Sequence, residues 1–165
     1  MPHLYLVRHA KADAIAEEDH LRCLTPAGHN DAMKLGGLFE QGLAQPDLVI
    51  CSTAIRTQQT YEVMQGAGLR VRDVRFDDGL YHASSDYIWH HVRQADCERV
   101  MVIAHNPAMA ILLNNLIPDN HIPPDLMHFP TATMAHLSFD AENFQAITEN
   151  TSKILHSLQK GATLT

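Results

Sequence analysis

The stretch "LYLVRHAKA", residues 4–12 of the 165-residue chain, gives the clearest indication of the fold. Its first four residues are apolar and predict a buried strand over about residues 3–7, which stops at Arg8 and His9, a cation beside an imidazole. Two further continuous apolar runs, 46–51 and 99–104, predict strands of the same kind, covered on both faces. Each of the three runs is followed directly by polar side chains, so candidate functional residues lie at the ends of these strands.

Helices are predicted between these strands. Thr25 followed by Pro26 is a favoured helix start, and apolar side chains recur three and four positions apart until Gly42. The other expected elements are helices over 52–68, 85–94 and from Pro107 onward with Asn106 as N-cap, and strands over 69–74, 131–139 and 144–151, the last two as a hairpin at one side. Alternating strands and helices predict an α/β fold, a three-layer α/β/α sandwich with a mostly parallel central sheet.

The bulk composition excludes several classes of protein. A net charge of −7 argues against general nucleic-acid binding and against an anionic membrane surface. Three widely spaced cysteines (Cys23, Cys51, Cys97) form neither a disulfide framework nor a CxxC motif, which favours a reducing cytoplasm. Twelve scattered histidines without an HExxH spacing predict no metal site. No linker or repeat interrupts residues 1–165, so we expect one domain, with a frayed tail after about residue 153.

The three long strands deliver their polar residues to one place, because ligands collect beyond the carboxyl ends of parallel strands. The first strand supplies Arg8 and His9, the second Ser52 and then Arg56, and the third His105 and Asn106. Taken singly, each has a structural explanation. A histidine after a strand is often a hydrogen-bonded structural residue, Arg56 could be a solvated helix residue, and Asn106 with Pro107 is a good helix start. Together, two arginines, two histidines and two helix N-termini predict a site for a tetrahedral phosphoryl group.

Three motifs carry a resemblance to a known family. The segment "YLVRHAKA", the S-x-x-x-R-T run at 52–57 and the late H-N-P at 105–107, in this order, resemble the histidine phosphatase superfamily with its phosphoglycerate mutase-like fold. Matching pieces cover most of the chain, and "RHA" with Ala10 is similar to the small SixA-like phosphohistidine phosphatases, where many other relatives have glycine. The resemblance implies hydrolysis without metal or cofactor, through a phosphohistidine intermediate.

The resemblance also implies roles for individual residues. His9 would be the nucleophile, and Arg8, Arg56 and His105 would clamp the phosphoryl oxygens, with His105 as an imidazolium. Supporting contacts to substrate are expected from the residues around them: Arg22, Lys11, Ser52 and Asn106.

The general acid that protonates the leaving group is left open by the sequence. Candidates lie in "RFDDGLYHASSD", residues 75–86: Asp77, Asp78, His82 and Asp86. A weak acid suits a phosphohistidine substrate because its P–N bond is labile, whereas an alkyl phosphomonoester depends on the proton by about 10²–10⁴ in rate. We therefore expect protein phosphohistidine as substrate and, in a chain without lid-forming inserts, no mutase activity.

Two alternatives remain at this point. One is a small-molecule phosphomonoesterase, in which Tyr81, His82 and Trp89 line a pocket for a base or sugar. The other is a non-catalytic module that keeps the clamp to bind phosphate or a phosphoprotein. The expected partner is accordingly a phosphorylated protein or a small phosphorylated substrate, with neither nucleic acid nor membrane, and the oligomeric state is left open.

Overall fold

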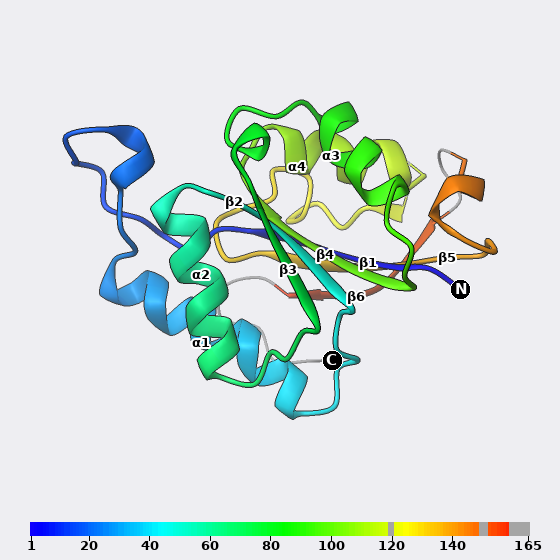
Figure 1. Ribbon diagram of the computed structural model, residues 1–165, viewed down its shortest axis with the longest axis horizontal. Coiled ribbons are helices and arrows are strands. Elements are labelled where there is room, and N and C mark those ends of the chain that lie inside the picture. Colours follow the sequence, from blue (N-terminus) through cyan, green and yellow to red (C-terminus); the bar gives the residue numbers. More distant parts are fainter. Residues whose placement is uncertain (119–120, 149–151, 159–165) are drawn as a thin grey trace.

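The computed structural model describes residues 1–118, 121–148 and 152–158, and within them six strands form one sheet in the order β3-β2-β4-β1-β5-β6 (Figure 1). The strands are β1 (His3–Arg8), β2 (Leu48–Ser52), β3 (Asp73–Asp77), β4 (Arg99–Ala104), β5 (Met134–Phe139) and β6 (Ser152–Leu158). The helices are α1 (Pro26–Glu40), α2 (Ile55–Gly66), α3 (Ser85–Arg93) and α4 (Ala108–Leu116). Short 3₁₀ helices are η1 (Asp19–Leu21), η2 (Asp78–Leu80) and η4 (Phe144–Ala146).

The sheet lies between two helical layers, which confirms the predicted three-layer α/β/α sandwich. α1 and α2 cover one face and α3 and α4 the other (Figure 1). Along β1 the side chains alternate: Leu4 and Leu6 join the core under α3 and α4, while Tyr5 and Val7 join the core over α1 and α2. All four side chains are fully buried, as expected for a strand covered on both faces.

The register of the parallel strands aligns their carboxyl ends. β1 pairs in parallel with β4, with Arg8 opposite Ala104, and β4 pairs in parallel with β2, with Ile103 opposite Cys51. The residues that follow these strands therefore emerge at one edge of the sheet. On its other side β1 pairs antiparallel with β5, and β5 with β6, so an antiparallel pair lies at one side as predicted, although its second strand is not the predicted one.

The start of α1 follows the expected capping chemistry, and the start of α4 does not. The Thr25 hydroxyl accepts a hydrogen bond from the Gly28 backbone N–H, with Pro26 as the first residue of α1. At α4, the residue in the N-cap position is Pro107, and the prediction of Asn106 as cap is wrong. The Asn106 amide instead donates to the carbonyl oxygens of His128 and Phe129, at 2.8 and 3.1 Å, because the 128–129 loop passes beside it.

Two predicted strands are misplaced. β3 covers Asp73–Asp77 rather than 69–74, because it is an edge strand with mostly exposed side chains and carries no apolar pattern that marks its bounds. The strand predicted over 144–151 is wrong: η4 begins there, with the Asn143 side chain accepting from the Ala146 N–H. Pairing with β5 starts at Ser152 and continues to Leu158, past the point where fraying was expected. The rest of that tail, 159–165, and residues 149–151 lie outside the described residues.

None of the described helices has the length and apolar character needed to cross a membrane.

The crossing of α1 over α2 depends on a residue without a side chain, Gly36. A Cβ at this position would stand 2.4 Å from the carbonyl oxygen of Met64 in α2, whereas a Cβ at the neighbouring Gly37 meets no atom within 4 Å. We expect Gly36→Ala to lower the free energy of unfolding by about 1–3 kcal/mol through overpacking. Gly37→Ala, the matched control in the same helix turn, should raise it by up to about 1 kcal/mol. Urea unfolding of both variants measures this, and equal effects would contradict the close helix contact.

Candidate active site

Three strand ends bring His9, Ser52 and His105 together. The rings of His9 and His105 lie 5.3 Å apart between centroids, and Nε2 of His105 is 2.8 Å from the Ser52 hydroxyl. Both imidazoles are almost completely buried, with 6% of His9 and 8% of His105 exposed. The edge of the sheet thus holds two desolvated imidazoles side by side.

The protonation of His9 follows from its partner. Nδ1 of His9 lies 2.8 Å from the carbonyl oxygen of Ala10, which can only accept, so Nδ1 carries the hydrogen. Burial, assisted by the positive charges of Arg56 and Arg8, lowers the pKa of His9 to about 4 against the opposing effect of the Ala10 hydrogen bond. The ring is therefore neutral near pH 7, and its Nε2 carries the lone pair.

Without a bound anion, His105 is also neutral, so the expected imidazolium requires phosphate to be present. Burial, followed by the neighbouring His9 and Arg56, lowers its pKa to about 3. The physical reason is that several basic groups share one desolvated space, so a further positive charge there is unfavourable. An anion bound among them would favour the protonated ring.

Two arginines from different elements, Arg8 and Arg56, supply the positive charge. An Nη atom of Arg8 donates to the Phe129 carbonyl oxygen at 3.1 Å, and burial together with Arg56 lowers the pKa of Arg8. Arg56 is 6% exposed and donates to the backbone oxygen and to Oδ2 of Asp19, at 2.8 and 3.1 Å. The Nε atoms of both arginines and Nδ1 of His105 are buried and have no hydrogen-bond partner among the described residues. These groups are available to a tetrahedral anion.

Asp19 is a central residue of the site that the sequence analysis missed. Its carboxylate accepts hydrogen bonds from the Tyr81 hydroxyl, from Arg56 and, at 3.0 Å, from Arg22. The Tyr81 hydroxyl, with Arg22 and Arg56, holds the pKa of Asp19 well below its usual range. The available signal was the spacing of Asp19 and Arg22, three residues apart, in what the sequence presents only as an acidic loop.

The loop before β5 closes the site on another side. The Phe129 carbonyl accepts from Arg8 and Asn106, and the Ala132 N–H donates to the His9 carbonyl at 3.1 Å. Phe129 and Ala132 have φ of 44° and 54°, a left-handed conformation that costs a non-glycine residue roughly 1–3 kcal/mol. Neither residue type signals such a conformation, so sequence reasoning had no means of finding this loop.

The supporting residues expected around the clamp are placed at different distances from it. Arg22 acts through Asp19 and also donates from Nε to the Asp13 carbonyl at 2.6 Å. Lys11 is exposed, and the contact it makes is through its backbone oxygen, which accepts from the Thr25 N–H. Asn106 lies beside Arg8 on the shared Phe129 carbonyl, with its own Oδ1 buried and without a partner in the described residues.

The candidate general acids are not gathered at His9. Asp77 accepts from the Gly79 N–H and from the Tyr87 hydroxyl, which turns it toward α3. Asp78 accepts from the Thr53 hydroxyl. His82 is exposed, with its ring 4.1 Å from that of Tyr81. No contact of these three with His9 occurs in the part of the chain that the structure describes.

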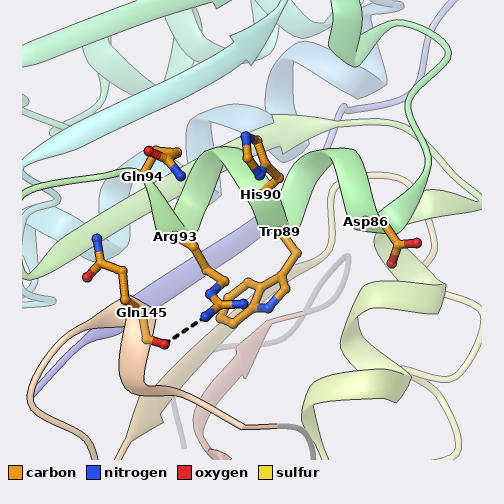
Figure 2. A pocket seen from close by; sticks show the side chains of 6 residues that line it. All are labelled: Asp86, Trp89, His90, Arg93, Gln94 and Gln145. Atoms are coloured by element: carbon orange, nitrogen blue, oxygen red, sulfur yellow. Dashed lines mark hydrogen bonds between the residues drawn. The ribbon is translucent and has the colours of Figure 1, made fainter.

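A separate cavity of about 270 Å³ lies on α3, as Figure 2 shows. Its lining includes Trp89, whose ring packs toward Phe139 with centroids 6.1 Å apart, and Asp86. Arg93 also lines it and donates to the Gln145 carbonyl at 2.7 Å (Figure 2). His9, Arg56 and His105 do not line this cavity. The base or sugar pocket of the small-molecule alternative therefore gains no support from Trp89, whose ring packs toward Phe139 of β5.

Among the described residues, no group of three or more His, Cys, Asp or Glu side chains is arranged to hold a metal ion.

The low pKa of His9 predicts how stability depends on pH. Because the folded-state pKa, about 4, lies below the ordinary 6.5, the unfolded chain takes up a proton first as the pH falls. The contribution of a neutral His9 to the free energy of unfolding is thus fully present above about pH 6.5 and is lost as the pH falls toward 4. Between pH 7 and pH 4 we expect His9→Gln to lose less unfolding free energy than the native protein, by on the order of 3 kcal/mol.

Urea unfolding at each pH measures this difference. His90→Gln, on the exposed side of α3, corrects for the removal of an exposed imidazole. Parallel pH dependences for the native protein and His9→Gln would contradict a neutral, buried His9.

Comparisons with known proteins agree with this geometry. The sequence model of the histidine phosphatase superfamily (branch 1) matches residues 4–84. An uncharacterized protein of Mycobacterium tuberculosis is 32% identical over 118 residues, which are 67% of this chain and 71% of that protein. The structure of a candidate phosphohistidine phosphatase SixA from Nakamurella multipartitia is 30% identical, with a TM-score of 0.81, and the match covers 98% of this chain and 97% of that one.

A second solved structure, of a candidate phosphohistidine phosphatase SixA from Agrobacterium tumefaciens, is 31% identical with a TM-score of 0.74, and the match covers 96% of this chain and 99% of that one. The motifs, the phosphoglycerate mutase-like fold and these matches lead to one assignment. The chain belongs to the histidine phosphatase superfamily, in its SixA-like group, and this family hydrolyses phosphoryl groups through a phosphohistidine intermediate.

Proposed function

We propose that this protein removes the phosphoryl group from phosphohistidine on other proteins, with His9 as the covalent nucleophile. The observation that carries the proposal is the state of His9: a buried, neutral imidazole whose Nδ1–H is held by the Ala10 carbonyl, which leaves the lone pair on Nε2. An imidazole fixed in one tautomer attacks phosphorus without first losing a proton. Arg8 and Arg56 flank it with buried Nε donors.

The clamp acts on the charge that develops during transfer. Arg8 and Arg56 bind the phosphoryl oxygens, and His105 becomes protonated once the dianion is bound, so that it also donates. Ser52 orients His105 through the 2.8 Å contact with its Nε2. Asn106 braces Arg8 at the Phe129 carbonyl, Arg22 braces Arg56 through Asp19, and the exposed Lys11 contributes positive potential at the mouth.

The substrate class follows from the carboxylates. Asp19, Asp77 and Asp78 all accept hydrogen bonds in the described structure, and none stands as a free carboxylic acid beside His9. A substrate that needs no proton at the scissile bond itself suits such a site, and phosphohistidine, whose P–N bond is labile, meets this condition. The names of the two solved relatives, both candidate phosphohistidine phosphatases, support the same choice.

The proposal extends to the setting of the enzyme. We infer one catalytic domain, because the last described strand, β6, completes the sheet that begins with β1. The cysteines Cys23, Cys51 and Cys97 are free thiols in the structure, which suits a reducing cytoplasm.

A covalent adduct on His9 is the direct test. After brief reaction with a phosphohistidine-bearing protein, we expect intact mass analysis to show one phosphoryl group that is labile to acid and stable to base. His9→Ala should show none and should lose at least about 10³-fold in turnover, because covalent catalysis is removed. His90→Gln, outside the site, should form the adduct like the native protein.

The outcomes separate the alternatives. An adduct formed from small phosphomonoesters but not from the phosphoprotein would favour a small-molecule phosphatase. Binding of phosphate without an adduct from any donor would favour a non-catalytic binding module.

We also propose that the chemistry requires no metal ion, because arginine and histidine side chains supply the positive charge. Phosphate release from a phosphohistidine protein should be unchanged, within about twofold, after dialysis against EDTA. A loss of activity that Mg²⁺ or Zn²⁺ restores would overturn this part of the proposal.

A further inference from the structure

His20, in η1, adjoins the clamp through the Tyr81 ring, although sequence reasoning assigned it no role. Its ring packs edge-on against Tyr81, with centroids 4.9 Å apart, and the Tyr81 ring lies 5.7 Å from that of His105. The residue before it, Asp19, holds Arg56. His20 therefore belongs to the same group of side chains as the clamp, joined to it through Tyr81 and Asp19.

A hydrogen-bonded chain fixes the tautomer of His20. The Thr53 hydroxyl donates its single proton to Oδ1 of Asp78, and its oxygen lies 3.2 Å from Nε2 of His20. Because that proton is committed to Asp78, the Thr53 oxygen must accept from His20, so Nε2 carries a hydrogen. Nδ1 is then the position at which a proton is gained or lost, and it makes no hydrogen bond within the described residues.

The surroundings favour His20 over the other candidate acids. Asp19 is held as a carboxylate by three donors, and Asp77 is engaged by Gly79 and Tyr87. His82, on the other side of Tyr81, is exposed and has no oriented partner comparable to Thr53. Two carboxylates lie near His20, Asp19 as the preceding residue of the chain and Asp78 through Thr53, and imidazole is the side chain most often used to move protons in catalysis.

We propose that His20 is the proton donor and acceptor of the reaction, oriented by Thr53 and Asp78. The inference rests on the proposed function. In the first step Nε2 of His9 bonds to phosphorus, the P–N bond to the substrate imidazole breaks, and Nδ1–H of His20 protonates the leaving ring. In the second step water bonds to phosphorus and gives a proton to Nδ1 of His20, and the P–Nε2 bond of His9 breaks. Phosphate leaves, and both histidines return to their starting states.

The chemistry of the leaving group explains why such a donor is set back from His9. A departing imidazole is neutralised by a proton on the ring nitrogen remote from phosphorus, whereas an ester oxygen needs the proton at the scissile bond itself. A donor whose contacts are with Tyr81 and Thr53 rather than with His9 therefore reaches the first substrate more readily than the second. The position of His20 thus refines the substrate class to phosphoryl groups carried on a ring nitrogen.

The experiment compares two phosphoryl donors in single turnovers, with phosphoenzyme quantified after base quench. A phosphohistidine peptide has a leaving group that requires a proton, and p-nitrophenyl phosphate has one that departs as a stable anion. In His20→Gln, which retains a side-chain N–H for Thr53, we expect phosphoenzyme formation from the peptide to slow by about 10²-fold and formation from p-nitrophenyl phosphate to change by no more than about threefold. Hydrolysis of the isolated phosphoenzyme should also slow by about 10²-fold.

The controls distinguish this role from a structural one. His90→Gln, in the separate α3 cavity, should match the native protein in every step. An equal loss with both donors, or no loss with either, would overturn the proposal, as would a loss confined to His82→Gln. If the native protein forms phosphoenzyme from p-nitrophenyl phosphate but not from the peptide, the proposal of phosphohistidine as substrate is overturned. The rate at which that phosphoenzyme hydrolyses in His20→Gln still decides whether His20 accepts the proton.

Discussion

The parallel pairing of β1 with β4 is the constraint on which the site depends. Arg8 stands opposite Ala104 in this register, so the next residues along the two strands, His9 and His105, emerge as neighbours. The register is held by burial on both faces, because a slip of one residue, about 3.3 Å, would exchange the two sets of core side chains along β1. The positions of the two imidazoles are therefore set by apolar packing several residues away.

The site gathers positively charged side chains, although the chain as a whole carries a net negative charge. A protein with a net charge of −7 gathers two arginines and two histidines in a space that water hardly reaches. The cost is limited by keeping both imidazoles neutral and by placing the Asp19 carboxylate against Arg56. A bound dianion reverses this balance: it favours a proton on His105, so that phosphoryl binding and proton uptake are coupled.

Sequence reasoning succeeded where one local pattern determines the structure. The apolar runs of β1 and β4, and Thr25 with Pro26, carry their own signals, and they place His9 and His105 at the strand ends. It failed where long-range contacts decide. β3 is an exposed edge strand whose bounds come from pairing with β2, and Asn106 prefers the 128–129 carbonyls to the cap of α4. Asp19 and His20 derive their significance from partners far along the chain, Arg56 and Thr53, which no local pattern reveals.

The central place of β1 has a consequence for the protein as it is being made. The strand that precedes His9 is translated long before its neighbours β4 and β5, which end at residues 104 and 139. At about 5–20 residues per second, the ribosome produces a chain that carries His9 for several seconds before His105 and the Phe129 loop exist to surround it. A nascent chain that has not passed β4 therefore lacks both His105 and the Phe129 loop around His9, and the site is complete only after residue 139 has been synthesised.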